Sequence, residues 1–294
     1  MLVTGASGLI GGHLLGALDP EADVIALSRS ARAGGDGVRW RVCDIERPGA
    51  LAEIVAAERP DVVIHLAGVV SGARSLEVVG PTLRANLVAT VELLEAAMGA
   101  GCRRIVLSGS LLEEPSTGGP QAVPPSPYGA SRWAASAYGR MFHALFDAPV
   151  TILRPSYAYG PGQERTKLIP YVITALLAGE SPRLSSGERE IDWIYAEDVA
   201  HAFIAAATQP GVDGLTLDVG SAIRAPVGDV VKTIVELVGP TGGTPEIGAV
   251  AVRRMEQDVV PDVEAAAAAL GWRAITPLDE GLRRTVAWYR DRLS

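Results

Sequence analysis

The chain has 294 residues, of which 48% are hydrophobic and 20% are charged, so it can bury a full core in one domain or in two closely packed ones. Its formal net charge of -8 argues against a nucleic-acid-binding or anionic-membrane surface, because such surfaces need clustered lysine and arginine. Its two cysteines, Cys43 and Cys102, lie far apart in apolar stretches, which argues against a disulfide framework and favours buried thiols in a reducing, cytoplasmic setting.

The first residues, MLVTGASG, have neither a basic start nor a long apolar run, so we expect no signal peptide. No apolar run approaches ~20 residues without a charge or a helix breaker, so we expect no membrane-spanning segment.

Short β-rich runs alternate with longer helical patterns from residue 1 to residue 155. This alternation is typical of a parallel sheet built from βαβ units. The predicted strands are MLVTG, DVIALS, VRWRVCD, DVVIHLAG, RRIVLSG and PVTILRP, and the predicted helices cover 8–18, 49–58, 79–99 and 126–147. Because the strands are largely continuous apolar runs, we expect helices on both faces of the sheet.

The rhythm changes after Pro155. A helix is predicted near 168–178, a strand and a helix within LSSGEREIDWIYAEDVAHAFIAAAT, a short strand at LTLDVG, and helices near 226–238 and 277–292. The predicted fold class is therefore α/β, a Rossmann-type doubly wound parallel sheet with a smaller, discontinuous C-terminal α/β substrate domain. We expect residues 1–155 plus about 190–220 to form the dinucleotide-binding domain, and residues 156–189 plus 221–294 to form the substrate-binding domain.

The stretch TGASGLIGGHLLGAL carries Gly5, Gly8 and Gly11 between a short strand and a helix. A dinucleotide-binding turn needs glycine for its tight bend, for close approach of the backbone to a pyrophosphate, and for packing of the helix on the strand. The strand-turn-helix context favours dinucleotide binding over a purely structural turn.

The end of the second strand, ALSRSAR, indicates which dinucleotide is bound. An acidic residue there would favour NAD, whereas a basic one accommodates the 2′-phosphate of NADP. Ser28, Arg29 and Arg32 stand there without a carboxylate, so we expect NADP(H) to be favoured and NAD(H) to remain possible; a solvated arginine is the structural alternative. Asp44, after the third strand, is a candidate for the adenine amino group or for a turn cap.

The stretch SPYGASRWAASAYGRMF supplies a candidate proton-transfer pair. Tyrosine exchanges a proton near neutral pH only with a positive charge beside it, and Tyr128 and Arg132 are one helical turn apart. Ser110, at the end of the preceding strand, could hydrogen-bond the same substrate oxygen. The alternative is an ordinary pair on a helix surface, but ligands bind at the carboxyl ends of such strands.

The chain resembles the extended short-chain dehydrogenase/reductase family, specifically its NAD(P)-dependent nucleotide-sugar epimerase, dehydratase and ketoreductase group. The resemblance covers nearly the whole chain and rests on TGASGLIG, DVVIHLAG, Asn86 in RANLVATVELLEAA, SPYGAS, LRPSYAYGPGQ, IDWIYAEDVA and the closing LGW…TPLDEGLRRTVAWY. These motifs are more specific to the fold than to the reaction.

The resemblance implies that Ser110 polarises the sugar oxygen, Tyr128 exchanges its proton, and Arg132 holds the nicotinamide ribose. The family uses lysine where this chain has Arg132, and arginine keeps the charge but is longer, planar and not interchangeable with lysine. We therefore expect binding to survive this departure and the rate to suffer.

The full set of cofactor-binding candidates follows from the glycine turn and the resemblance: Gly5, Ser7, Gly8, Leu9, Ile10, Gly11, Ser28, Arg29, Arg32, Asp44, Ile45, Leu66, Ala67, Gly68, Asn86, Ser108, Tyr128, Arg132 and Pro155. The substrate-binding candidates are Ser71, Ser110, Tyr157, Lys167, Arg189 and Arg254. A nucleoside diphosphate brings about two negative charges, which an acidic protein must meet with placed cations, although each cation could instead be a solvated surface charge.

The residues after Ser110 separate the reactions of the group. Its dehydratases follow this position with an Asp-Glu pair, whereas Leu111 and Leu112 stand here and Glu113 and Glu114 come two positions too late. A 4-ketoreductase or a 4-epimerase remains, and the NADP preference favours the ketoreductase. A dinucleotide-sensing binding protein with weakened catalysis is the alternative of a different class, motivated by Arg132.

We expect no metal site, because the four histidines lie in no Cys or acidic ligand pattern, and His65, inside an apolar strand, is predicted to be structural. The resemblance further implies a homodimer through the helices at 79–99 and 126–147.

Overall fold

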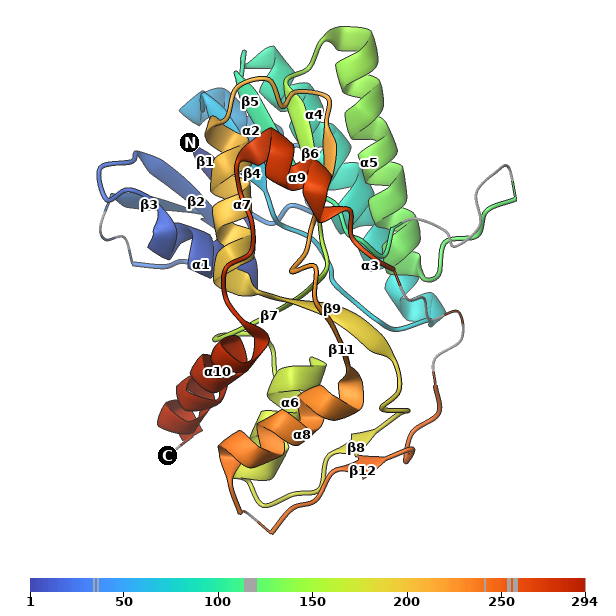
Figure 1. Ribbon diagram of the computed structural model, residues 1–294. Helices are drawn as coiled ribbons and strands as arrows, with labels where there is room; N and C mark the ends of the chain where they lie inside the picture. The colour runs from blue at the N-terminus through green and yellow to red at the C-terminus, as the bar shows by residue number, and fades with distance from the viewer. Residues whose placement is uncertain are drawn as a thin grey trace.

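A computed structural model of the chain describes residues 1–33, 35, 37–113, 121–240, 242–252, 255 and 259–293. The upper part of the molecule in Figure 1 is a seven-stranded sheet in the order β10-β6-β5-β4-β1-β2-β3, in which every pair of neighbours is parallel. Its strands are β1 (Leu2–Thr4), β2 (Val24–Ser28), β3 (Val38–Val42), β4 (Val62–His65), β5 (Arg104–Ser108), β6 (Val150–Pro155) and β10 (Thr216–Val219).

Helices cover both faces of this sheet. One face carries α1 (Leu9–Ala17), α7 (Ala196–Thr208) and α9 (Val263–Leu270). The other carries α2 (Ala50–Glu58), α4 (Ala89–Gly99) and α5 (Pro127–Phe146), with α3 (Val79–Thr82) and a π-helical turn, η2 (Leu83–Val88), leading into α4. The predicted doubly wound α/β fold is confirmed, and the six strands and four helices predicted before residue 155 lie where the sequence placed them.

Consecutive strand residues fill two different cores. In β1, Leu2 packs into the core beneath α2 and α4, whereas Val3 packs into the core beneath α1 and α7. Because side chains alternate between faces and both faces are covered, both positions must be apolar. The edge strand β3 is different, since it pairs only with β2 in this sheet and its side chains are only partly buried or exposed.

The lower part of the molecule is a smaller α/β unit (Figure 1). A three-stranded sheet contains β7 (Tyr157–Tyr159), β9 (Glu190–Tyr195) and β11 (Arg224–Pro226), and a two-stranded sheet contains β8 (Arg183–Leu184) and β12 (Glu246–Ile247). Beside these sheets lie α6 (Leu168–Leu177), α8 (Val227–Val238) and α10 (Leu278–Leu293), which share one apolar core with β9. A short 3-10 helix, η1 (Leu76–Val78), precedes α3 in the upper part.

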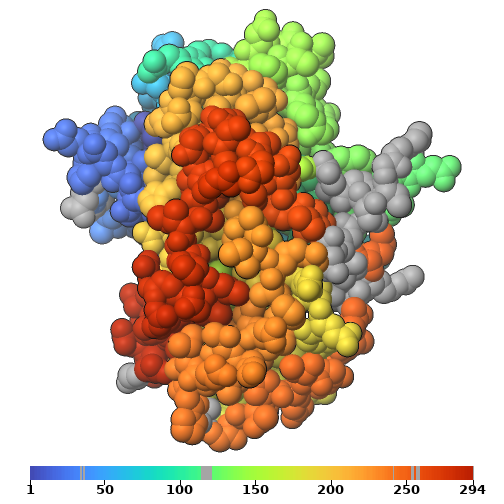
Figure 2. Space-filling view, viewed as in Figure 1, coloured from blue at the N-terminus to red at the C-terminus, as the bar shows by residue number. Residues whose placement is uncertain are grey.

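Strand β9 joins the two parts. Ile191, Trp193 and Tyr195 point into the lower core, whereas Ile194, on the opposite face of the strand, belongs to the upper core. The tail is shared in the same way, because α9 packs on the seven-stranded sheet and α10 packs on the lower part, as the red segments of Figure 2 show. These packings run across the expected domain boundaries, and the division into two domains stays a prediction.

Cys43 and Cys102 are both buried and not bonded to each other, as the sequence predicted. Within the described ranges, none of the helices is both long enough and apolar enough to cross a membrane.

Candidate active site

The glycine turn lies against the loop that follows β4. Gly5 has a φ of 65°, and a Cβ built on it would lie 2.6 Å from the backbone nitrogen of Ala67. A Cβ on Gly11 would lie 2.2 Å from the Gly5 carbonyl oxygen, so both positions exclude any side chain. Helix α1 begins after Gly8 with no acidic residue in its first turn, and no described side chain caps it. Its first N–H groups can therefore bind an anion, and the turn fits the pyrophosphate of a dinucleotide.

The chain is basic where the second strand, β2, ends beside this dinucleotide cradle.

 Arg29 and Arg32, after β2, are both exposed, and the Arg32 guanidinium lies 5.3 Å from the centre of the Trp40 ring. The Ser28 hydroxyl donates a hydrogen bond to the Ser30 carbonyl oxygen, which tightens the turn after the strand. The Asp44 carboxylate accepts a hydrogen bond from the Glu46 backbone N–H at 3.0 Å, so the structure shows the turn-capping role that the sequence left open for it.

Tyr128 and Arg132 lie on the buried face of α5. The helix begins at Pro127, where proline suits a first helical turn, and the Ser126 side chain caps it by accepting the Gly129 N–H at 3.0 Å. Tyr128 is 8% exposed and Arg132 is 2% exposed, and the guanidinium carbon lies 5.7 Å from the centre of the tyrosine ring. The spacing of four residues thus brings a cation against the phenol.

Arg132 also connects α5 to the end of β5 and lies against the loop after β4. Its Nη1 donates to the Ser108 carbonyl oxygen at 2.7 Å, and its Nη2 lies 2.4 Å from the position that a Cβ on Gly68 would take. Its Nε is buried and has no hydrogen-bond partner among the described residues, so one donor of the guanidinium is unsatisfied. Gly68 is next to Ala67, which contacts the glycine turn, and the structure therefore brings Arg132, with Tyr128 beside it, to the same end of the sheet as the dinucleotide cradle, where the strands terminate.

Ser110 is held by a buried carboxyl group. Its backbone N–H donates to Glu113 Oε2 at 3.0 Å, and the Ser136 hydroxyl donates to the same oxygen at 3.0 Å. Burial raises the pKa of Glu113 to about 7, although these two hydrogen bonds and the charges of Arg154 and Arg132 oppose the rise. From the sequence, Glu113 was considered only as a carboxylate that comes too late for the dehydratase pair, and its contact with Ser110 was not predicted. The one signal of this contact in the sequence is that the two residues are three positions apart.

The predicted substrate-binding residues lie in both parts of the molecule, and one of them is outside the described residues. Lys167 Nζ donates to the Val70 carbonyl oxygen at 2.8 Å, so this lysine of the lower part reaches the loop after β4. Arg189 Nη2 donates to the Tyr157 hydroxyl at 2.5 Å, and its guanidinium carbon lies 5.2 Å from the centre of that ring. Ser71 accepts the Ala73 N–H at 3.2 Å within the same loop as Val70. Arg254 lies outside the described residues, as do Arg253 and Glu114.

The other cofactor candidates lie around the same strand ends. Ser7 is in the glycine turn, Leu9 and Ile10 begin α1, Ile45 follows β3, Leu66 follows β4, and Pro155 ends β6. Asn86, in the π-helical turn, accepts the Val69 N–H at 2.8 Å through Oδ1 and donates through Nδ2 to the Ser131 hydroxyl at 2.9 Å.

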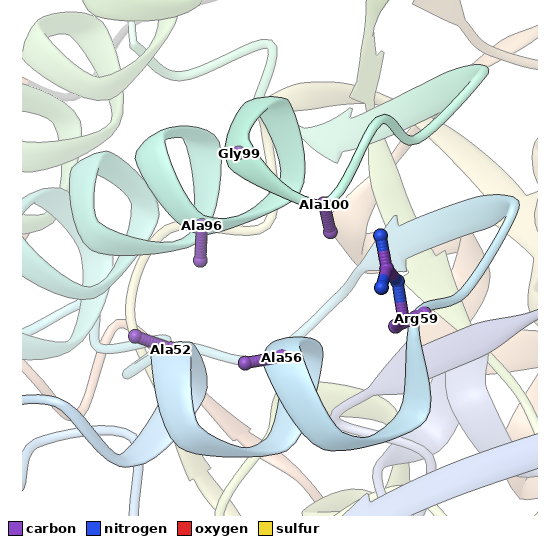
Figure 3. Close-up of a pocket in the computed structure, with 6 residues that line it drawn as sticks. All are labelled: Ala52, Ala56, Arg59, Ala96, Gly99 and Ala100. Atoms are coloured by element: carbon purple, nitrogen blue, oxygen red, sulfur yellow. The ribbon is translucent and has the colours of Figure 1, made fainter.

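Two further features bear on what the molecule can bind. Among the residues that the structure describes, no group of three or more His, Cys, Asp or Glu side chains could hold a metal ion. A groove of about 400 Å³ lies between α2 and α4, away from the glycine turn, and its described lining contains none of the predicted site residues (Figure 3). The groove is lined by Ala52, Ala56, Arg59, Ala96, Gly99 and Ala100.

The sequence is similar to that of known nucleotide-sugar enzymes. The sequence model described as "NAD dependent epimerase/dehydratase family" matches residues 1–220. A dTDP-glucose 4,6-dehydratase from Neisseria gonorrhoeae is 30% identical over 331 residues, covering 99% of this chain and 95% of that protein. A UDP-glucose 4-epimerase from Mycolicibacterium smegmatis is 28% identical over 319 residues, covering 99% of this chain and 98% of that protein.

Solved structures agree with the sequence comparison. MoeE5, in complex with UDP-glucose and NAD, is 30% identical, with a TM-score of 0.87 over 100% of this chain and 99% of that chain. A UDP-glucose 4-epimerase from Thermotoga maritima, with UDP-glucose, has a TM-score of 0.88 over 100% of this chain and 99% of that chain at 24% identity, which shows the shared fold.

Proposed function

This chain belongs to the NAD dependent epimerase/dehydratase family, and from that premise we propose that it catalyses redox chemistry at C4 of a nucleotide-linked sugar, most specifically the NADPH-dependent reduction of a 4-keto group. The observation that carries the proposal is the placement of Tyr128, with the Arg132 guanidinium against its ring, beside the loop that touches the glycine turn. A buried phenol beside a cation is the arrangement that proton exchange with a sugar oxygen needs.

Each residue has a role that its position supports. When bound, the nicotinamide supplies the hydride. Tyr128 gives the proton of its hydroxyl to the C4 oxygen as the keto group becomes an alcohol, and Ser110 donates a hydrogen bond to that oxygen. Arg132 would help to hold the nicotinamide ribose, and it keeps a positive charge beside Tyr128. The reverse of these transfers oxidises an alcohol at the same carbon.

The charge at the end of β2 supports NADP(H) as the cofactor. Arg29 and Arg32 are exposed there, and the segment Val24–Ser28 with the four residues after it contains no carboxylate. A 2′-phosphate would meet two cations and no like charge. A net reduction consumes NADPH, whereas an epimerase regenerates its cofactor in each cycle. A preference for NADP(H) therefore favours the ketoreductase.

A 4-epimerase is the second candidate, and two of the similar proteins support it. The M. smegmatis relative is a UDP-glucose 4-epimerase, and MoeE5 holds UDP-glucose with NAD. The residues after Ser110 disfavour dehydration, although several relatives of this chain are dTDP-glucose 4,6-dehydratases. Leu111 and Leu112 follow Ser110, and the Glu113 carboxylate is bonded to the Ser110 N–H and to Ser136.

The diphosphate of the substrate would meet the cations of the lower part. The Lys167 ammonium has three N–H donors and uses one of them in its hydrogen bond to the Val70 carbonyl oxygen. A second donor could bind a phosphate oxygen. The Arg189 guanidinium donates to the Tyr157 hydroxyl and lies against its ring, so its positive charge is held in the lower part, where it would attract a phosphate. A homodimer is supported by apolar side chains exposed on the helical face of the upper part, namely Val79, Leu83, Val88 and Tyr138.

The test is turnover of a dTDP-4-keto-6-deoxy sugar by the purified protein with NADPH, followed by the loss of absorbance of the reduced nicotinamide. Tyr128→Phe keeps the ring and removes the proton, so we expect kcat to fall on the order of 100- to 10,000-fold. Interconversion of two 4-hydroxy sugars without net consumption of cofactor would favour the epimerase. Stoichiometric cofactor binding without turnover, unimproved by Arg132→Lys, would favour a dinucleotide sensor.

A further inference from the structure

A chain of buried polar side chains runs beneath the candidate active site. It consists of Thr4 at the end of β1, His65 at the end of β4, Thr90 in α4, Asn86 in η2 and Ser131 in α5, and none of the five is more than 5% exposed. We call these five residues the polar chain. The sequence predicted His65 to be structural, and its ring is indeed hydrogen-bonded at both nitrogens.

The hydrogen bonds of the polar chain run in one direction. The Thr90 hydroxyl lies 2.7 Å from the Asn86 carbonyl oxygen, which can only accept, so Thr90 donates to it. The Thr90 oxygen can then accept a hydrogen bond from the Nε2–H of His65, 3.2 Å away. Burial, together with the charge of Arg132, lowers the pKa of His65 to about 3, so the ring carries one proton at neutral pH.

The other end of the polar chain agrees with this tautomer. With its proton on Nε2, His65 accepts at Nδ1, and the Thr4 hydroxyl donates to that nitrogen across 2.7 Å. The Thr4 oxygen in turn accepts the Ala67 N–H at 3.1 Å, and this N–H can only donate. Ala67 is the residue that contacts Gly5, so the polar chain begins at the dinucleotide cradle.

The polar chain ends at the helix that carries Tyr128. The Thr90 hydroxyl donates to the Asn86 carbonyl oxygen of the π-helical turn Leu83–Val88, and this rare form of helix is frequent at functional sites. Asn86 Nδ2 donates to the Ser131 hydroxyl, and Ser131 donates to the Tyr128 carbonyl oxygen at 2.8 Å. These hydrogen bonds connect His65 to the first turn of α5.

We infer that His65 is a positioning residue whose neutral, Nε2-protonated ring sets the place of Tyr128 and Arg132 relative to the dinucleotide cradle. A core of apolar residues could fill the same space, but it would not fix the rotation of the π-helical turn or the distance between Ala67 and α5. The inference rests on the proposed function, because it gives His65 a part in proton transfer at Tyr128.

Matched variants test the hydroxyl and the ring separately. Thr90→Val keeps the shape of the side chain and removes its hydroxyl, whereas Thr90→Ser keeps the hydroxyl. His65→Leu removes both ring nitrogens, whereas His65→Gln keeps one acceptor and one donor. We expect kcat to fall roughly 10- to 100-fold in Thr90→Val and His65→Leu, with KM for the sugar little changed, and to recover in Thr90→Ser and His65→Gln. Equal kcat in Thr90→Val and Thr90→Ser would overturn the inference.

A second measurement needs no turnover. Nitrogen-15 NMR of the histidine side chains should show His65 protonated at Nε2 alone from pH 5 to pH 9, with this signal displaced in Thr90→Val and kept in Thr90→Ser. A ring protonated at Nδ1, or one that titrates in this range, would overturn the inference even if the enzyme is active. The tautomer signal in a protein that turns over no nucleotide sugar would instead count against the proposed function alone.

Discussion

The fit of Arg132 depends on Gly68, and Gly68→Ala tests that dependence. The new Cβ would lie 2.4 Å from Arg132 Nη2 and 2.5 Å from Asn86 Oδ1, about 1 Å inside the 3.4 Å at which ordinary contact begins. Neither neighbour can withdraw freely. Arg132 is bonded to the Ser108 carbonyl at 2.7 Å, and Asn86 is bonded to the Val69 N–H at 2.8 Å.

The expected magnitude follows from overpacking of a buried site. We expect Gly68→Ala to lower the free energy of unfolding by about 2 kcal/mol. Arg132→Lys replaces the planar guanidinium with a single ammonium, and Gly68→Ala should then cost at least about 1 kcal/mol less. The control is Gly12→Ala, where a Cβ would have nothing within 4 Å.

Urea denaturation of the four proteins of this double-mutant cycle gives the coupling between positions 68 and 132. If Gly68→Ala lowers the free energy of unfolding equally in the wild-type and Arg132→Lys backgrounds, the argument that Gly68 makes room for the guanidinium is wrong. The affinity for NADPH, measured by fluorescence, should fall with the same pattern, because the displaced guanidinium is the proposed ribose ligand.

Three further predictions concern single residues. Because burial raises the pKa of Glu113 to about 7, its protonated form favours folding; its contribution is present below pH 4.5 and is lost as the pH rises through 7. The free energy of unfolding of the wild type should therefore fall by roughly 3 kcal/mol across that window relative to Glu113→Gln, and parallel pH profiles would contradict this. Arg29→Asp should move the ratio of dissociation constants from NADPH toward NADH, because a carboxylate repels the 2′-phosphate; an unchanged ratio would refute the basic-end argument. Lys167→Met should raise KM for the nucleotide sugar about 10-fold, with Kd for the cofactor unchanged, because a charge-assisted contact to phosphate is lost; an unchanged KM would remove Lys167 from the site.

The sequence was sufficient for the fold class. Strands buried on both faces need apolar residues at most positions, so largely apolar runs such as DVIALS and PVTILRP predict burial, and the helices are predicted from the longer segments between these runs. The glycine turn could also be predicted from the sequence, because the positive φ of Gly5 and the contact of Gly11 with the Gly5 carbonyl oxygen are local features that favour glycine.

The contacts between strand ends could not be read in this way. Glu113 turns back to the Ser110 N–H, Lys167 reaches the Val70 carbonyl, and His65 connects Thr4 to Thr90, and no local pattern specifies any of these pairs. The sequence by itself determined the sheet, the cradle and the helical spacing of Tyr128 and Arg132, because these depend on periodicity and on neighbours along the chain. Only the tertiary structure decided that Arg132 fills the space beside Gly68, because that fit depends on how two strand ends and one helix pack together.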